Sequence, residues 1–226
     1  MNLNYNFQEI SFKSITEQLY DYLSESIIEG KIGPGEKLNE IKLCQEFGIS
    51  RSPLRECFRI LEAESLIDII PRKGAFVRKV TRKDIEDFFP VRAKLEGLAA
   101  TLAVQHITEE EISTLDDLLK KMDGAYKKGD VKSFFRLNDT FHGVFLRASR
   151  NEILEKIIKN INKGIWQRIS YLYFESPYGI NLSNEKHKEI VETFKRKDNF
   201  SAGKVVEEHI LQTQEQFLLF WDNRGL

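Results

Sequence analysis

The strongest constraint on the fold of this chain is a series of three short helices and a basic hairpin predicted within residues 14–77. Residues 14–29 place apolar side chains at helical spacing, and Gly30 then favours the end of a helix. The glycines and the proline of residues 31–38 interrupt regular structure and predict a turn. Residues 40–47 follow as a second, short helix.

The third predicted helix combines an apolar face with a cationic one. It follows Gly48 across a tight turn, and Ser50 is positioned to cap its N-terminus. The cations are Arg51, Arg55 and Arg59, and the apolar residues are Leu54, Cys57, Phe58 and Leu61. Because residues four apart share a helix face, the arginines form one row opposite the apolar residues. An arginine fork suits guanine edges and phosphates, although such a row also occurs on ordinary solvated helices.

Two short strands around a basic turn are predicted after Leu66, with Pro71-Arg-Lys-Gly between Ile67-Asp-Ile-Ile and Ala75-Phe-Val. The stretch from Arg72 to Lys83 holds six cations and no acid, although the whole chain has a net charge of -1. Positive charge is therefore concentrated locally. Two helices across a tight turn followed by a basic hairpin make up the winged variant of the helix-turn-helix, which predicts binding to double-stranded DNA.

From Thr81 onward the pattern predicts about six helices. The expected breaks are residues 104–108, 128–130, 149–151, 175–182 and 197–201. Thr108 and Glu111 form a capping box, Asp130 and Asn151 are expected N-caps, and Pro90 should bend or split the first of these helices. The predicted fold is mainly α. It has a winged helix-turn-helix of three helices and a small β-hairpin wing at residues 1–79, and an antiparallel all-helical bundle at residues 80–226.

Composition excludes several classes of protein. No apolar run approaches the roughly 20 residues that cross a bilayer, so no transmembrane helix and no membrane partner are expected. The first residues lack the basic and apolar regions of a signal peptide. Cys44 and Cys57 both fall in helical patterns where a small hydrophobic residue fits, so a disulfide framework is not expected. These features favour a cytoplasmic protein.

Three of the four histidines lie in the C-terminal half at suggestive positions. Asn138 and His142 are one helical turn apart, while His187 and His209 lie on two further predicted helices. Three helices of a bundle can therefore direct four donors at one point. Imidazole nitrogen is a preferred donor for zinc, nickel and similar ions, and an amide oxygen can complete the set. Spacing alone leaves open the alternative that each histidine is a hydrogen-bonded core residue.

Residues 31–77 resemble the DNA-binding domain of GntR-type regulators. The resemblance is carried by Pro34-Gly, a helix, Gly48-Ile-Ser-Arg, Pro53-Leu-Arg-Glu, Leu61-Glu-Ala-Glu-Ser-Leu and a wing ending in Gly74-Ala-Phe-Val. It implies that Arg51 and Arg55 contact the operator and that Lys73 and Gly74 reach the minor groove. The predicted DNA-binding residues are Arg51, Ser52, Arg55, Arg59, Arg72, Lys73 and Gly74. Two positions depart from the family pattern, Ile41 where a DNA-contacting arginine is frequent and Ser65 where glycine is usual.

From Val80 onward the chain resembles the all-helical effector domain of the FadR branch of that family, in its metal-binding FCD type. The matching positions are Arg92 and Glu96 for R-x-x-x-E, Asn138 and His142 for D/N-x-x-x-H, and the later His187 and His209. The resemblance implies that Asn138, His142, His187 and His209 bind a divalent transition metal, zinc or nickel. It also implies a pocket for a small carboxylate effector. We expect Arg92 or Arg168 to hold that effector, unless Arg92 instead forms a structural pair with Glu96.

These features predict a homodimeric, ligand-responsive transcription regulator that binds a pseudo-palindromic operator. The alternative is a hydrolase-like metalloenzyme that uses the Asn/His cluster to activate water. The sequence offers no His-Glu-x-x-His motif, no nucleophile in a recognisable setting and no glycine-rich phosphate loop for it. Non-specific nucleic-acid binding, a third possibility, is disfavoured by the net charge of -1.

Overall fold

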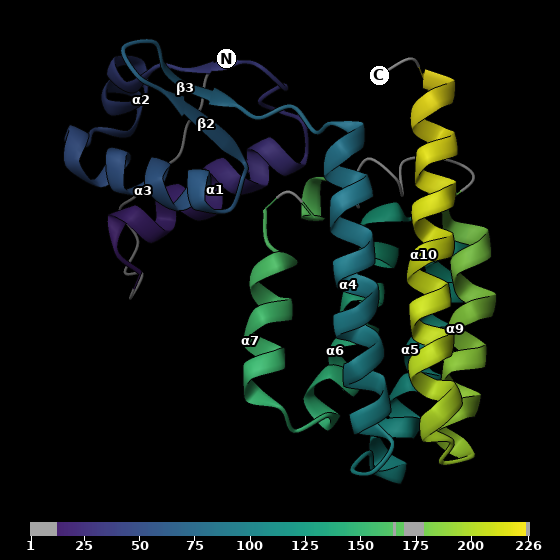
Figure 1. Cartoon of the computed structure of the whole chain (residues 1–226). Helices are drawn as coiled ribbons and strands as arrows, with labels where there is room; N and C mark the ends of the chain where they lie inside the picture. The colour runs from purple at the N-terminus through teal and green to yellow at the C-terminus, as the bar shows by residue number, and fades with distance from the viewer. Residues whose placement is uncertain (1–12, 165, 170–178, 225–226) are drawn as a thin grey trace. The chain divides into compact units, whose positions relative to one another are not determined.

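A computed structural model describes residues 13–164, 166–169 and 179–224 of the chain, which divide between two compact units. The N-terminal unit contains the residues up to Val80 together with Asn162–Arg168. The C-terminal unit contains Thr81–Ile161 and the residues from Ile169 onward. Figure 1 shows both units as ribbons. Among the helices of the described residues, none has the length and apolar character to cross a membrane.

Residues 13–80 of the N-terminal unit form three helices and a small sheet, as the sequence predicts. The helices are α1 (Ile15–Ile28), α2 (Glu40–Phe47) and α3 (Arg51–Ala63), and the strands are β1 (Lys37–Leu38), β2 (Ile67–Ile70) and β3 (Gly74–Val77). The sheet order is β1-β3-β2, with both pairs antiparallel. Strand β1 lies in residues 31–38, for which the sequence predicts only a turn. Two residues are too few to show the alternation of a strand, so β1 is defined by its partner β3.

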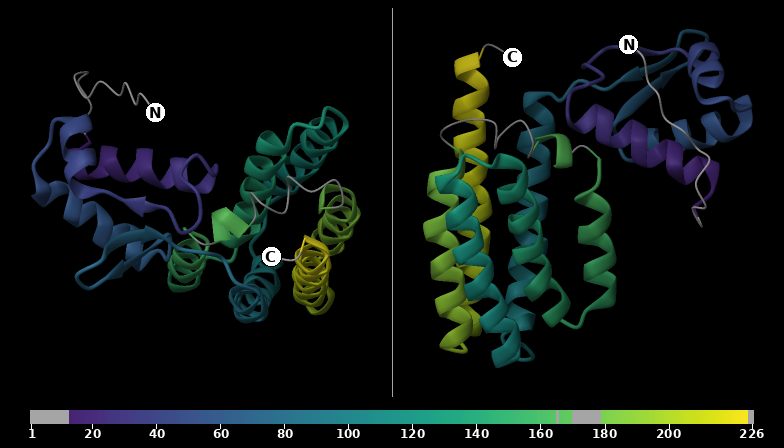
Figure 2. Two further views of the ribbon diagram at one scale, coloured as in Figure 1. Left: turned by 90° about the horizontal axis from the view of Figure 1, so that it is seen from above. Right: turned by 180° about the vertical axis from the view of Figure 1, so that it is seen from behind.

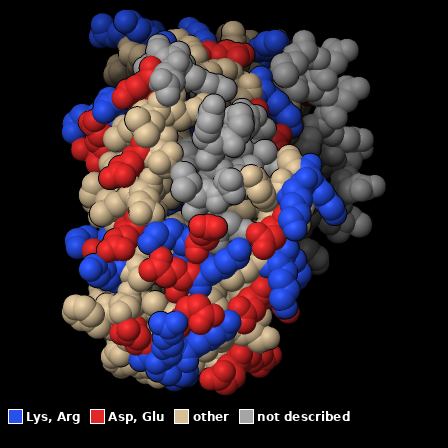
Figure 3. All heavy atoms as spheres, turned by 90° about the vertical axis from the view of Figure 1, so that its right-hand side faces the viewer, with Lys and Arg blue, Asp and Glu red and all other residues tan. Residues whose placement is uncertain are grey.

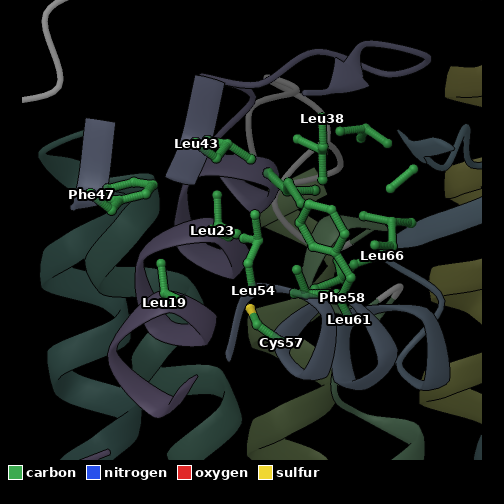
Figure 4. Close-up of a cluster of buried hydrophobic side chains, with 14 residues drawn as sticks. Leu19, Leu23, Leu38, Leu43, Phe47, Leu54, Cys57, Phe58, Leu61 and Leu66 are labelled. Atoms are coloured by element: carbon green, nitrogen blue, oxygen red, sulfur yellow. The ribbon is translucent and has the colours of Figure 1, made fainter. Parts of the chain in front are cut away.

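The core of this unit fills the space between α1, α3 and the sheet. Figure 4 shows the buried face of α3, with Leu54, Cys57, Phe58 and Leu61, directed toward Leu19 and Leu23 of α1. Burial raises the pKa of the Cys57 thiol to about 12, so this side chain packs as a small neutral hydrophobic group. Cys44 and Cys57 are both free thiols, in agreement with the predicted absence of a disulfide.

The tight turn between α2 and α3 is built by backbone conformation rather than by the predicted cap. Gly48 has φ +65°, a left-handed conformation that glycine adopts without strain, and it ends α2. Ser50 occupies the N-cap position of α3, but its side chain makes no capping hydrogen bond. The prediction is therefore correct that Ser50 is the N-cap residue of α3 and wrong that its side chain makes the capping hydrogen bond. Asn39 does cap α2, because its Oδ1 accepts from the N–H groups of Ile41 and Lys42.

The helices of the C-terminal unit form a closed ring. Among the described residues they are α4 (Arg82–Ala103), α5 (Glu109–Lys127), α6 (Val131–Ala148), α7 (Glu152–Ile161), α9 (Gly179–Lys195) and α10 (Asn199–Arg224). Each helix of the ring contacts the next, in the order α4, α10, α9, α5, α6, and α6 contacts α4 again. Helix α7 packs on α4 and α6. Successive helices alternate in direction (Figures 1 and 2), as predicted for an antiparallel bundle.

Most predicted helix ends in this unit are confirmed. Thr108 and Glu111 form the capping box of α5. The side chain of Asp130 accepts from the N–H of Ser133, and that of Asn151 accepts from the N–H of Leu154. Helix α4 continues through Pro90 as one helix, so of the two outcomes predicted at Pro90, a bend or a split, the split does not occur.

Helix α7 is shorter than the sequence pattern suggests. No break was expected between residues 151 and 175, yet α7 ends at Ile161 and the chain then joins the N-terminal unit. The predicted break at residues 175–182 lies partly outside the described residues, and α9 already begins at Gly179.

Helices α4 and α10 approach each other closely at two glycines. A Cβ atom on Gly97 of α4 would lie 3.0 Å from the carbonyl oxygen of Gly203 and 2.5 Å from Cγ of Glu207. A Cβ atom on Gly203 would lie 2.2 Å from Oγ1 of Thr101. Neither position has room for a larger residue, so the two backbones are in direct contact. This contact sets the position of α10, which carries His209, against α4, which carries Glu96.

Candidate functional site

The predicted arginine row lies on the exposed face of α3. Arg51, Arg55 and Arg59 are all exposed, and so is Ser52, while the opposite face of the helix fills the core. Cationic side chains backed by a buried apolar face are held outward by the packing of the helix itself. This surface has the shape and charge that entry into a DNA groove requires.

The hairpin between β2 and β3 presents the second group of cations. Ile70 pairs with Gly74, and Arg72 and Lys73 lie exposed in the turn between them. Gly74 has φ +108°, which a residue with a side chain rarely adopts, and this lets the chain turn directly into β3. The Nζ of Lys37 lies 5.7 Å from the ring centroid of Phe76, so β1 adds another cation beside the wing.

Charge is distributed differently on the face of the C-terminal unit formed by α9 and α10. Figure 3 shows Lys and Arg interspersed with Asp and Glu on this side of the molecule. The helices of this unit also form ion pairs with one another, as between Lys94 and Glu207 or between Lys195 and Asp116. An interspersed surface attracts a polyanion weakly, which contrasts with the row on α3.

Three histidines meet inside the ring of the C-terminal unit. His142 on α6, His187 on α9 and His209 on α10 are all buried, and one nitrogen from each lies within 4.8 Å of the others. The Nε2 atoms of His142 and His187 are 3.3 Å apart. Residues separated by up to 67 positions in the sequence are thus brought to one point, since the helices that carry them are neighbours in the ring.

The surroundings of this histidine group favour neutral imidazoles. Burial lowers the pKa of His187 and of His209 well below the ordinary value, and the positive charge of Arg92 contributes to both shifts. Both rings are therefore neutral at pH 7 and each offers a nitrogen lone pair. A neutral ring nitrogen is the form that binds a metal ion.

A buried carboxylate holds His142 in orientation. Glu96 Oε2 lies 2.5 Å from His142 Nδ1, and Glu96 Oε1 accepts from Arg92 Nε at 2.5 Å. Burial alone would raise the pKa of Glu96, but Arg92 and His142 together hold it well below its usual range, so the group is ionised. An ionised Glu96 accepts a hydrogen bond from the Nδ1–H group, which leaves Nε2 of His142 directed toward the other histidines.

Asn138, the fourth predicted ligand, offers an independent test of fit for a metal. Its Oδ1 is buried and has no hydrogen-bond partner among the described residues, an arrangement that is costly unless something else binds the oxygen. It lies one turn before His142 on α6. Three imidazole nitrogens and one unpaired carbonyl oxygen match the donors that zinc and nickel prefer, so the residues fit the group that the FCD resemblance implies.

Comparison with known proteins assigns the chain to a family. The model of bacterial regulatory proteins of the gntR family matches residues 15–77, and the FCD domain model matches residues 87–212. The chain belongs to the GntR family. It is 32% identical to the HTH-type transcriptional regulator YdhC of Bacillus subtilis (strain 168), over 85% of this chain and 86% of that protein. The HTH-type transcriptional repressor RspR of Escherichia coli (strain K12) is 25% identical over 89% and 88% of the two chains.

Solved structures confirm the fold of this GntR-family protein. McbR/YncC of E. coli has a TM-score of 0.74 at 23% identity and covers 93% of this chain and 100% of its own. A putative GntR regulator of Rhodococcus sp. RHA1 has a TM-score of 0.73 at 20% identity, over 91% and 98%. The relatives are transcription regulators, so the protein is a DNA-binding regulator with an FCD domain and not the metalloenzyme considered as an alternative.

Ser65, which stands where the family pattern usually has glycine, keeps the backbone conformation that glycine favours. Ser65 has φ +59°, the left-handed region that glycine enters without strain. This GntR-family protein therefore keeps the turn conformation after α3 without the glycine, at a cost of about 1–2 kcal/mol. Ile41, the other departure, is 58% exposed on α2 and places an apolar side chain on the surface of the helix-turn-helix.

Arg168, predicted as an effector-binding cation, groups with the N-terminal unit. Its Nη1 donates to the carbonyl oxygen of Ile27, and burial lowers the pKa of its guanidinium. Gly164 of the same segment has φ +58°, and a Cβ atom there would lie 2.0 Å from the carbonyl oxygen of Glu64. The segment is thus packed against α1 and the end of α3.

Arg92, the other predicted effector-binding cation, is buried beside Glu96. The effector role of either arginine stays a prediction.

Two residues at these sites were not assigned a role from sequence. Glu96 was noted only as a possible partner of Arg92, and its contact with His142 was missed. Its spacing of four from Arg92 was the available signal, but only the fold brings α4 against α6. Glu40 accepts hydrogen bonds from Arg55 and had no signal of its own, because an acidic residue at the start of a helix is common.

Proposed function

We propose that this protein is a homodimeric, ligand-responsive regulator of the FadR branch that reads a pseudo-palindromic operator. The N-terminal region, residues 1–79, binds the DNA through the predicted residues of α3 and the wing, and residues 80–226 hold the metal, the effector and the dimer contact. The exposed arginine row on a helix that is buried on its other side carries the proposal, together with the GntR and FCD matches. Arg51, Arg55 and Arg59 read base edges or phosphates, and Arg72, Lys73 and Gly74 follow the adjacent groove.

The dimer follows from the geometry of operators. A single recognition helix covers only a few base pairs, whereas two related by a two-fold axis read two half-sites and gain affinity together. An effector acts on such a dimer when it favours one relative arrangement of the two DNA-binding heads.

Selection of bound fragments from random-sequence DNA tests this function. We expect the protein to enrich an inverted repeat, and light scattering to give twice the chain mass of 26.4 kDa for the free protein and that mass plus the mass of the duplex for the complex. A pool that shows no common sequence after selection would refute the operator proposal. Enrichment of a single, unrepeated half-site by a monomer would refute the dimer.

The effector site is proposed at the histidine group of the C-terminal unit. Asn138, His142, His187 and His209 would hold a divalent zinc or nickel ion, which supplies an electrophilic position for a carboxylate oxygen. Glu96 keeps His142 in the required orientation, and the Arg92 guanidinium adds positive charge close to the site. The support is the match between the four donors and the metal, and the position of a cation beside them.

A thermal-shift screen of small carboxylates with the zinc-loaded protein tests the effector. A ligand at a hundredfold excess over its Kd stabilises the native state by about 2.7 kcal/mol, which raises Tm by roughly 5–10 °C for a protein of this size. We expect at least one carboxylate to do so and to change operator affinity, while the matching amide does neither. If amides and carboxylates behave alike throughout the screen, the carboxylate class is wrong.

A further inference from the structure

One ion pair of the N-terminal unit joins the two helices of the helix-turn-helix across their tight turn. Glu40 is the first residue of α2, and its Oε2 accepts from both Nε and Nη2 of Arg55 on α3, each at 3.2 Å. Its position in the first turn of a helix favours the negative charge. Arg55, a predicted operator contact, therefore has an intramolecular partner in the protein without DNA.

The geometry of this pair leaves the DNA-reading edge of the guanidinium available. An arginine side chain has five N–H donors in a fixed plane. Glu40 uses the edge formed by Nε and Nη2, so the end formed by Nη1 and the second hydrogen of Nη2 points away from the carboxylate. Two parallel donors at that end are what a bidentate contact with O6 and N7 of guanine requires. Glu40 and a guanine can thus bind the same guanidinium together.

A purely structural role explains this pair poorly. The side chains of Arg55 and Glu40 are 61% and 31% exposed, and exposed ion pairs contribute little to stability because water screens them. A carboxylate beside a DNA-binding surface also repels phosphates, which weakens binding to every sequence. Glu40 therefore lowers the affinity for DNA in general and adds little to the free energy of unfolding. Its contact with Arg55 is the remaining effect that can explain its position.

We propose that Glu40 is a positioning residue that determines operator specificity by holding Arg55 in one orientation. The proposal rests on the function proposed above, in which Arg55 contacts the operator. A long, flexible side chain loses rotamer freedom when it binds a base, and this loss is smaller when the side chain is already held. The fixed orientation also limits which base pair Arg55 reaches, so Glu40 favours one operator over other sequences while it reduces affinity for DNA in general.

Replacement of Glu40 by alanine separates these two effects because they have opposite signs. We expect Glu40→Ala to bind the selected operator roughly tenfold more weakly, a part of the discrimination that one bidentate contact provides. Affinity for unrelated DNA should stay the same or rise, since a repulsive charge has been removed. The base pair at which preference relaxes should be the one at which Arg55→Ala relaxes it. Urea unfolding of the variant should match that of the parent protein.

Glu46→Ala is the matched control, because it removes the same charge from the same helix and its ion-pair partner there is Lys42. It should not change the ratio of operator to unrelated affinity. In an Arg55→Ala background, Glu40→Ala should have no further effect on that ratio. The inference fails if Glu40→Ala raises both affinities together, changes neither, or acts equally without Arg55. Should Arg55→Ala itself leave operator affinity unchanged, the proposed function fails instead.

Discussion

Replacing Arg55 with alanine should remove most of the preference for the operator over unrelated DNA while leaving the protein folded. One bidentate arginine–guanine contact discriminates by about 1–3 kcal/mol, and a symmetric dimer makes it twice, so we expect a loss of at least about 30-fold. The folded state should tolerate the change because the side chain is 61% exposed and its ion pair is screened by water. Electrophoretic mobility shift with operator and unrelated duplexes at one fixed salt concentration measures both affinities.

Lys120→Ala provides the control for loss of a positive charge. Lys120 lies on α5, is 76% exposed and pairs with Asp117, so its removal changes the net charge by the same amount at a place with no predicted DNA contact. It should leave the specificity ratio unchanged. Unaltered operator binding by Arg55→Ala, with normal folding, would contradict the assignment of α3 as the recognition helix.

The fold was predictable from sequence wherever a helix is amphipathic and its ends are marked. The bounds of α2 are those predicted, because Gly48 marks its end and an apolar face repeats at helical spacing. The capping box of α5 defines its start in the same way. Local signals of this kind depend on neighbours in the sequence and need no knowledge of the rest of the fold.

The features that were missed depend on contacts distant in sequence. Strand β1 exists because Lys37 and Leu38 pair with β3, which lies almost 40 residues later. Helix α7 ends at Ile161 although the apolar pattern continues, because the following residues pack in the N-terminal unit beside Glu64 and Ile27. A two-residue strand has no periodicity, so β1 is not encoded in the local pattern. Gly164, with φ +58°, is a local signal for the end of α7, but it does not indicate where the following residues pack.

The histidine group illustrates both limits. Position along the predicted helices placed Asn138 and His142 on one helix face and His187 and His209 on two further helices, and the family resemblance favoured a metal site over separate core histidines. Nothing local indicated that Glu96 would hold His142, because that contact depends on the packing of α4 against α6. The residues of the group were therefore predictable from the sequence, while the contact that orients His142 required the fold.

Removal of one histidine of this group should abolish metal binding and the stability that it provides. With zinc at a hundredfold excess over its Kd, the parent protein should gain about 2.7 kcal/mol, or roughly 5–10 °C in Tm. His209→Gln removes one of three imidazole nitrogens that lie within 4.8 Å of one another, so the zinc-dependent shift should disappear and elemental analysis should show no bound metal. Nickel tested in the same way distinguishes between the two expected ions.

His106→Gln is the matched control. His106 is the one histidine of the sequence that does not belong to the group, and it lies in the turn after α4. It should keep one metal ion per chain and the full shift in Tm. Apo forms of both variants should unfold like the apo parent protein, which separates loss of the metal from loss of packing. Equal metal content in His209→Gln and the parent protein would mean that the three buried histidines are core residues and that any metal binds elsewhere.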